Sequence, residues 1–182
     1  VVHHYGERKP LERVIAKQKL YLLLGEKKIQ EQTDNPQAYA ELASQYAEMG
    51  MFLKALEYYR KALENDANNE EWWGEIASIL LILGKDKEAE RAFSIAIKLN
   101  KNYFPAWRNL GLLHIKSKQW DKALEALYQA NRIRPDESEI LESIGVILLE
   151  KGEKEKAREY FLLLSNKEPE NVRAKSYLNL YE

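Results

Sequence analysis

Hydrophobic and polar positions along the chain recur with a period of 34 residues. Small alanines form one column of this repeat, at Ala55, Ala89, Ala123 and Ala157. Four residues after each alanine comes a bulky apolar side chain, at Tyr59, Phe93, Leu127 and Phe161. Sixteen residues before each alanine stands another large residue, at Tyr39, Trp73, Trp107 and Leu141. Because both groups of columns follow helical spacing, each period predicts a pair of packed helices.

Helix-breaking residues recur with the same period. Gly50, Gly84 and Gly152 fall where the first helix of a pair should end in a left-handed residue, and Lys118 takes that place in the third period. Pro36 and Pro105 fall where a first helix should begin, where a missing N–H does no harm. The pattern therefore predicts a helix, a tight turn and a second helix in every period.

These columns resemble the tetratricopeptide repeat (TPR) family, whose pattern is W-x2-L-G-x2-Y, then A-x3-F, then A, then P. The repeats would be residues 36–69, 70–103, 104–137 and 138–171. The closing proline is present as Pro135 and Pro169 but replaced by Ala67 and Lys101. The resemblance implies an all-α, right-handed solenoid of four helix-turn-helix repeats.

The two ends of the chain read differently from the repeats. Residues 172–182 predict a capping helix that covers the last repeat with Ala174, Leu178 and Tyr181. Residues 1–35 predict a basic helical arm or a degenerate half-repeat, because Tyr21–Gly25 echoes Tyr46–Gly50. A helix from Leu11 to about Gln30 would carry Leu11, Val14, Ile15 and Leu22 on one stripe. As a cap it would pack on the first repeat through Leu11, Ile15 and Leu22.

Charge separates the arm from the first repeat. Residues 7–28 carry seven basic side chains against three acidic ones, whereas residues 29–71 carry nine acidic side chains against three basic ones. Opposite charges at two surfaces favour docking between them, within one chain or between two copies. Packing of the arm as a simple N-terminal cap is the alternative, and an arm that touches membrane lipid or is disordered is a third.

In TPR proteins the first helix of each repeat, helix A, lines a concave groove through repeat positions 2, 5, 6, 9, 12 and 13. By that resemblance we expect the partner-binding groove residues to be Glu41, Ser44, Glu48, Glu71, Glu75, Ser78, Leu81, Ile82, Arg108, Asn109, Leu112, Ile115, Glu142, Val146 and Leu149. They combine an acidic flank with an apolar strip, as a groove for an amphipathic helix or an extended peptide requires. The alternative is that the apolar members only pack between helices.

Other kinds of chemistry find little support in the sequence. The net charge of −1 argues against nucleic-acid binding, and the absence of cysteine excludes thiolate metal sites and disulfides. His3 and His4 stand near the terminus without further ligands at helical spacing, and His114 occupies a core column. No phosphate-binding loop or nucleophile motif occurs. We therefore expect no metal, no cofactor, no small-molecule substrate and no enzymatic activity.

The sequence thus predicts a protein–protein interaction scaffold whose partner is a protein or peptide, including one with a basic amphipathic segment. A self-assembling structural module that associates through the N-terminal arm, and a targeting or regulatory domain of a larger protein, are the alternatives. Ala40 and Gly74 stand at position 5, where TPR proteins that bind a C-terminal carboxylate carry a polar or basic residue, so that mode is not expected. Trp120 is expected in the core, whereas Trp72 could anchor a partner. A cytoplasmic location is the first expectation, and a periplasmic or membrane-anchored one the alternative, because the chain starts with Val1 rather than Met.

Overall fold

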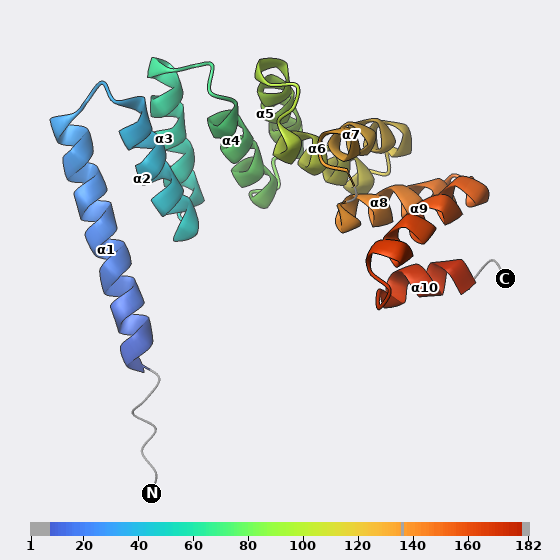
Figure 1. Ribbon diagram of the computed structural model, residues 1–182. Helices are drawn as coiled ribbons and strands as arrows, with labels where there is room; N and C mark the ends of the chain where they lie inside the picture. The colour runs from blue at the N-terminus through green and yellow to red at the C-terminus, as the bar shows by residue number, and fades with distance from the viewer. Residues whose placement is uncertain (1–7, 136, 180–182) are drawn as a thin grey trace, which may run out of the picture. The chain divides into compact units, whose positions relative to one another are not determined.

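A computed structural model describes residues 8–135 and 137–179, and in these ranges it consists of ten α-helices without a strand (Figure 1). The helices are α1 (Arg8–Glu31), α2 (Pro36–Glu48), α3 (Phe52–Asn65), α4 (Glu70–Ile82), α5 (Asp86–Leu99), α6 (Phe104–Lys116), α7 (Trp120–Ile133), α8 (Ser138–Glu150), α9 (Lys154–Lys167) and α10 (Val172–Asn179). From α2 onward, helices A (α2, α4, α6, α8 and α10) alternate with helices B (α3, α5, α7 and α9). The predicted all-α repeat fold is confirmed.

Asparagine side chains begin three of the helices A in the same way. Asn35, Asn69 and Asn171 occupy one repeat position, and each Oδ1 accepts a hydrogen bond from the backbone N–H three residues later, at 3.3, 3.0 and 3.0 Å. Such N-caps satisfy one of the backbone donors that a helix start leaves unpaired. The polar side chain just before each helix therefore fixes where it begins.

The turns from helix A to helix B adopt the left-handed conformation that the sequence predicts. Gly50, Gly84 and Gly152 have φ of 72°, 72° and 78°, and Lys118 adopts φ of 55° in the third repeat. At Lys118 the turn is still closed by two backbone hydrogen bonds of 2.9 Å, from Lys118 to Ile115 and from Gln119 to His114. The hydrogen-bonded turn is thus kept where glycine is absent.

The chain divides into two compact units, residues 1–85 with α1–α4 (unit 1) and residues 86–182 with α5–α10 (unit 2). The boundary lies inside the second repeat, between its helix A and its helix B.

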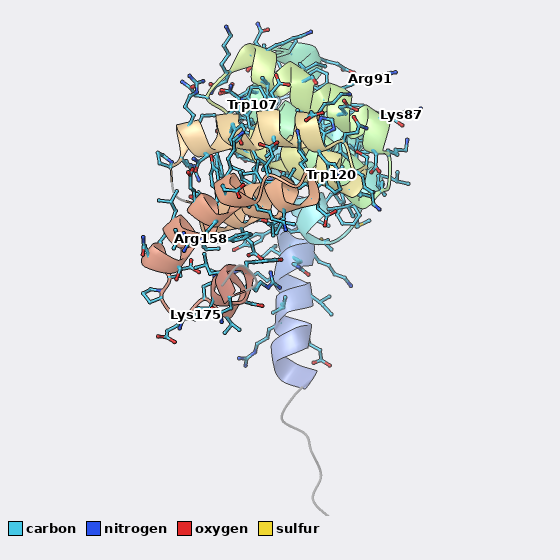
Figure 2. All side chains as sticks on the ribbon, turned by 90° about the vertical axis from the view of Figure 1, so that its right-hand side faces the viewer. Lys87, Arg91, Trp107, Trp120, Arg158 and Lys175 are labelled. Carbon is cyan, nitrogen blue, oxygen red and sulfur yellow. The ribbon has the colours of Figure 1, made fainter. Side chains whose placement is uncertain are left out.

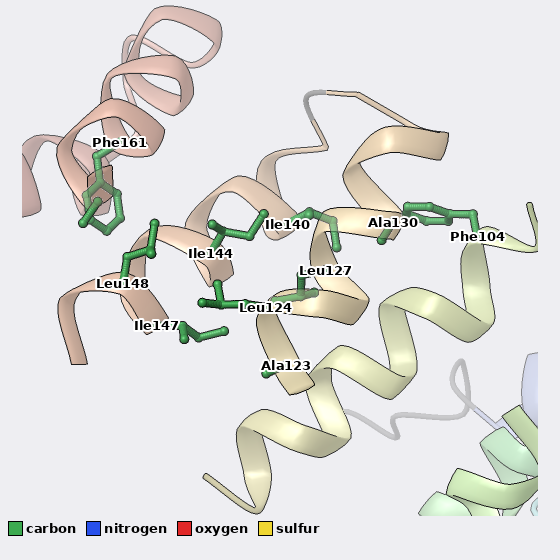
Figure 3. Close-up of a cluster of buried hydrophobic side chains, with 11 residues drawn as sticks. Phe104, Ala123, Leu124, Leu127, Ala130, Ile140, Ile144, Ile147, Leu148 and Phe161 are labelled. Atoms are coloured by element: carbon green, nitrogen blue, oxygen red, sulfur yellow. The ribbon is translucent and has the colours of Figure 1, made fainter. Parts of the chain in front are cut away.

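Close helix packing holds unit 2 together. Its main cluster of buried side chains includes Ala123, Leu127, Ile144 and Phe161, all with 0% exposure (Figure 3). Gly111 lets α6 approach α7, because a Cβ there would lie 2.6 Å from Leu127 Cδ2. Small residues in these columns therefore set the helix spacing, and the prediction that Ala123 is buried is confirmed.

Helix α10 packs against α8 and α9. Ala174 is fully buried with Leu141 and Leu164, and the ring of Tyr177 stacks on Phe161 at 4.3 Å between centroids. Leu178 is half-buried against the same core, whereas Tyr181 lies outside the described residues. Tyr177 is therefore the aromatic contact of this helix that the structure shows.

Unit 1 begins with the helix that the sequence predicts from Leu11 to about Gln30. Helix α1 runs from Arg8 to Glu31 and continues through Gly25. Gly25 allows close approach of α2, since a Cβ there would lie 2.9 Å from Leu42 Cδ1. Ile15 is 42% exposed and does not pack as expected, and the side chain of Leu11 lies outside the described residues.

The structure shows what the tryptophan side chains contact. Trp73 and Trp107 donate their indole N–H to the carbonyls of Ala67 and Lys101, at 3.0 and 2.9 Å. Those two carbonyls belong to the residues that replace the closing proline. Trp72 is only 6% exposed, so the hypothesis that it anchors a partner is wrong, while Trp120 packs against the core of unit 2.

Candidate functional site

The candidate site is the surface of the helices A that carries repeat positions 2, 5, 6, 9, 12 and 13, which we call the A-face. Unit 1 contributes the A-face of α2 and α4, and unit 2 that of α6 and α8. None of the fifteen expected groove residues is buried. Five are exposed, namely Glu41, Glu48, Glu71, Glu75 and Ile82, and the other ten are half-buried, namely Ser44, Ser78, Leu81, Arg108, Asn109, Leu112, Ile115, Glu142, Val146 and Leu149.

Ion pairs connect successive helices across the A-face of unit 2. Arg108 on α6 lies 3.7 Å from Glu139 on α8, and Glu142 on α8 lies 3.1 Å from Arg173 on α10. Both pairs join position 5 of one helix A to position 2 of the next, 31 residues later. Their side chains are largely exposed, except that of Glu142 at 23%. The pairs therefore hold neighbouring helices in register more than they add stability.

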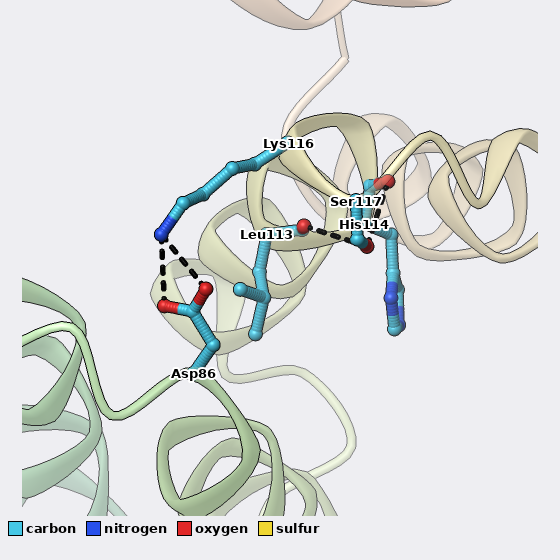
Figure 4. Close-up of polar contacts among 5 residues, drawn as sticks. All are labelled: Asp86, Leu113, His114, Lys116 and Ser117. Atoms are coloured by element: carbon cyan, nitrogen blue, oxygen red, sulfur yellow. Dashed lines mark hydrogen bonds and ion pairs between the residues drawn. The ribbon is translucent and has the colours of Figure 1, made fainter.

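A third ion pair ties the end of α6 to the start of α5. The Lys116 ammonium donates to both carboxylate oxygens of Asp86, at 3.0 and 2.8 Å (Figure 4). At the other end of the same stripe, Arg108 Nε donates to Asn109 Oδ1 at 3.3 Å. The basic residues of the A-face in unit 2 are thus engaged within the protein.

Between these charges lies a row of half-buried apolar side chains. Ile115, Val146 and Leu149 pack in part against the core of unit 2, and Leu112 stands one helical turn before Ile115 on the same stripe. Packing between helices accounts for part of their burial, as the alternative from the sequence anticipated. Each still offers apolar surface to water beside charged groups.

The A-face of unit 1 presents a different electrostatic picture. Glu41 accepts a hydrogen bond of 2.6 Å from Lys28 on α1. Within the part of the chain that the structure describes, Glu48, Glu71 and Glu75 form no ion pair. Ile82, at the C-terminal end of the same stripe, is 62% exposed. This face therefore combines free carboxylates with an apolar side chain in solvent.

The pKa of Glu75 reflects this environment. Partial shielding from water raises the pKa of the Glu75 carboxyl above its ordinary value, and the neighbouring Glu71 carboxylate raises it further. One turn later, Ser78 Oγ donates to the backbone carbonyl of Gly74 at 2.9 Å. A cationic group placed between Glu71 and Glu75 would relieve their repulsion, so the site favours positive charge in a ligand.

Small residues explain why unit 1 lacks the ion pairs of unit 2. In unit 1 position 5 is occupied by Ala40 and Gly74, which are both buried. In unit 2 the same position carries Arg108 and Glu142. No side chain at Ala40 can reach out to Glu71 as Arg108 reaches to Glu139. In unit 2 the side chains at position 5 therefore form ion pairs between neighbouring helices A. In unit 1 the small residue at this position leaves the carboxylate of Glu71 unpaired among the described residues.

The charge pairing in unit 2 was not anticipated from the sequence. Arg173 is exposed and yet pairs with Glu142 on the preceding helix A. The signal that could have revealed this is opposite charge at position 5 and at position 2 of the following helix A, which occurs at Arg108 and Glu139 and again at Glu142 and Arg173.

His114 is a buried member of the core and not a ligand-binding group. It is 4% exposed, and its Nε2 lies 3.9 Å from Glu90 Oε1, beyond hydrogen-bond distance. Burial lowers the pKa of its imidazole. No group of three or more His, Cys, Asp or Glu that could hold a metal occurs among the described residues, and His3 and His4 lie outside them. Nor does any described helix combine the length and apolar character needed to cross a membrane.

Comparison with solved structures places the fold among TPR proteins. MamA superimposes with a TM-score of 0.79 over 95% of this chain and 99% of that chain, at 24% sequence identity. YrrB, described as a TPR protein with an unusual peptide-binding site, gives a TM-score of 0.77 over 86% of this chain and 80% of that chain, at 22% identity. At these identities the likeness concerns the fold alone.

Sequence comparison identifies the family. The BBSome complex member BBS4 of Bos taurus is 36% identical over 107 residues, which cover 58% of this chain and 20% of that protein. The chain thus spans about a fifth of the length of this relative. The family described as the cilia and flagella-associated protein 70 C-terminal domain matches residues 16–181. The chain therefore belongs to this family of TPR domains.

Proposed function

We propose that this protein is a non-catalytic interaction scaffold that binds a peptide or an amphipathic helix of a partner protein along its A-faces. TPR domains in general serve protein interaction, and the fold is typically non-catalytic. The observation that carries the proposal is the row of half-buried apolar side chains on α6 and α8, at Leu112, Ile115, Val146 and Leu149. An amphipathic helix that covered this row would bury apolar surface and place its polar side chains against the flanking charges.

The free carboxylates of unit 1 define what the A-face of that unit would bind by itself. Glu48, Glu71 and Glu75 would attract a segment with Lys or Arg residues, while Ile82 would contact an apolar side chain of that segment. The proposed partner segment is therefore basic and amphipathic. That YrrB has a peptide-binding site is consistent with this proposal, although it is a property of that protein.

Self-assembly through α1 is the second candidate. In unit 1 the α1 residue Lys28 already pairs with Glu41 of the same chain, at 2.6 Å, which removes one base and one acid from docking between copies. We therefore place it behind partner binding. The mass of the protein in solution, measured at low and high salt with and without residues 1–30, distinguishes the two: a mass that rises with concentration and depends on the arm would favour self-assembly.

A displayed library of random peptides tests the proposal directly. We expect the wild-type protein to select basic amphipathic peptides, and the double variant Leu112→Glu, Leu149→Glu to bind them at least about tenfold more weakly, because two apolar contacts are lost. Ile82→Glu changes a side chain that is 62% exposed and should weaken binding without affecting the fold.

The matched control is Leu53→Glu on α3, where a leucine is 74% exposed away from the A-face. Circular dichroism should show the same helicity in every variant. If Leu112→Glu, Leu149→Glu and Ile82→Glu all bind the selected peptides as tightly as Leu53→Glu does, the A-faces are not the binding surface.

A further inference from the structure

Helix α1 has two apolar faces, only one of which is packed. Contact with α2 includes Gly25, which lies against Leu42, and a 2.8 Å hydrogen bond from the Tyr46 hydroxyl to Glu26. Leu22 and Ile29 are half-buried. A second group of apolar residues points elsewhere and is strongly exposed: Leu20 at 52%, Tyr21 at 45%, Leu23 at 63% and Leu24 at 51%. We call this second group, with its interleaved basic residues Arg13, Lys17 and Lys27, the outer face of α1.

The spacing of these residues makes the outer face a continuous stripe. Arg13, Lys17, Leu20, Leu24 and Lys27 follow one another at intervals of three or four, as neighbours on one side of a helix do. Three neighbouring leucines exposed to solvent, Leu20, Leu23 and Leu24, are unusual on a protein surface and indicate an interaction site. Figure 1 shows α1 at the edge of unit 1, beside α2.

Helix α10 offers a contrast to the outer face of α1. The exposed residues of α10 are mainly polar, with Arg173, Lys175 (Figure 2), Ser176 and Asn179 in solvent. Helix surfaces of repeat proteins that stay in contact with water are polar in this way. The outer face of α1 is instead rich in leucine, so it has the chemistry of a surface that another helix covers.

Charge indicates which kind of helix fits. Arg13 and Lys17 have no acidic partner in the described part of the chain, and the Lys17 ammonium lies 5.4 Å from the Tyr21 ring centroid. Lys27 lies 3.6 Å from the exposed Glu31. A second α1 would bring the same positive charges together, which is unfavourable, whereas acidic side chains would pair with them.

We infer that the outer face of α1 binds an acidic amphipathic helix of a partner protein, whose leucine-sized side chains cover Leu20, Leu23 and Leu24 and whose carboxylates meet Arg13, Lys17 and Lys27. This surface is separate from the A-faces. The inference therefore stands even if the A-faces bind nothing, and it fails without affecting them.

A synthetic probe tests the inference on the full chain. The probe is a fluorescent 21-residue helix with leucine at intervals of three and four and glutamate on both flanks; a scrambled peptide of the same composition and a lysine-flanked version serve as comparisons. We expect the glutamate-flanked helix alone to bind. Leu20→Glu with Leu24→Glu should weaken it at least about tenfold, and Lys17→Glu about threefold, with the second effect reduced by salt.

Matched controls come from α3 in the same unit. Leu53→Glu replaces another exposed leucine and Arg60→Glu another exposed base, and neither should change probe binding. Two further measurements cover the other occupants: sedimentation with vesicles containing phosphatidylserine, and the mass of the protein against its concentration.

The inference is overturned if the glutamate-flanked helix binds no better than its scrambled or lysine-flanked versions, or if the variants on the outer face behave like the α3 controls. Vesicle binding that Leu24→Glu abolishes would assign the face to a membrane surface instead. A concentration-dependent mass that the same variant abolishes would assign it to a second copy.

Discussion

The A-faces of the two units differ in whether the carboxylates at corresponding repeat positions are paired. In unit 2, Glu139 at position 2 pairs with Arg108, and Glu142 at position 5 pairs with Arg173. In unit 1, Glu71 at position 2 has no basic partner among the described residues. Position 5 of the preceding helix A is Ala40, so the side chain that would pair with Glu71 is missing. One repeat framework can thus use a column to align its helices or leave it open to an outside ligand.

The difference extends to how each face is supported. In unit 2 the A-face lies on helices whose approach is set by Gly111, where a Cβ would meet Leu127 Cδ2 at 2.6 Å and Cγ at 2.7 Å. In unit 1 the comparable close approach is that of Gly25 to the far end of the Leu42 side chain, at 2.9 Å. The A-face of unit 2, with ion pairs between closely packed helices, favours a preformed binding site. The A-face of unit 1, with fewer such pairs, can adapt to its ligand.

The largest expected effect tests this support. Gly111→Ala should lower the free energy of unfolding by about 2 kcal/mol, because a methyl group is forced against the branch point of a fully buried leucine. Gly25→Ala should change it by less than about 1 kcal/mol, since the end of Leu42 can turn aside and alanine favours the helix. Urea denaturation of both variants gives the comparison. Equal losses would show that the two units are packed with the same tolerance.

The next effect concerns ligand affinity. Glu71→Lys with Glu75→Lys should weaken binding of a basic amphipathic peptide about tenfold at low salt, because attraction turns into repulsion. Removing the charges of Glu139 and Glu142 with glutamine should change affinity less, since both carboxylates already have partners in the protein. Titration by fluorescence anisotropy at two salt concentrations measures this. A larger loss for the pair in unit 2 would contradict the assignment of free and engaged carboxylates.

A smaller effect concerns the ion pairs themselves. A double-mutant cycle with Glu142→Gln and Arg173→Gln should give a coupling energy of about 0.5 kcal/mol, since Arg173 is largely exposed. High salt should reduce this coupling. A coupling that is zero at low salt would mean that the pair does not hold α8 and α10 in register.

The repeat columns made much of the fold predictable. The glycines of the helix A to helix B turns, the prolines at helix starts and the buried alanines such as Ala123 follow from periodicity and local chemistry. The close contact at Gly25 was not predicted, because a glycine that ends a helix and one that admits a neighbouring helix look alike in sequence. Only the packing partner, here Leu42, decides between them.

The candidate site was predictable in position but not in electrostatics. Repeat numbering placed the fifteen residues on one set of helices, and the structure finds none of them buried. Whether a carboxylate is free or paired depends on the next helix A, as the pairing of Glu142 with Arg173 shows. The charge of one residue in a repeat cannot reveal this, whereas reading positions 5 and 2 of consecutive repeats together would.

The smallest expected effect is a difference in pH dependence between the units. Shielding and Glu71 raise the pKa of Glu75 above the unfolded value of 4.5, so the charged form costs stability in the folded state. This cost is present at neutral pH and disappears as the pH falls through the raised pKa. Burial lowers the pKa of His114 below the unfolded value of 6.5, so its contribution has the opposite sign. As the pH falls below 6.5 the unfolded chain takes up a proton that the folded chain does not, and stability is lost.

Two variants separate these contributions. Glu75→Gln should remove the stabilisation gained on acidification toward pH 4.5, and His114→Leu, which introduces the residue found at Leu80 and Leu148 in the same column, should remove part of the loss below pH 6.5. Glu90 and Glu125 face His114 together with Lys122, and their charges moderate its titration. The measurement is the difference in unfolding free energy between each variant and the wild type from pH 4.5 to 7.5. Opposite slopes for the two differences would confirm the contrast between a crowded acidic face in unit 1 and a buried neutral core in unit 2, and slopes of the same sign would refute it.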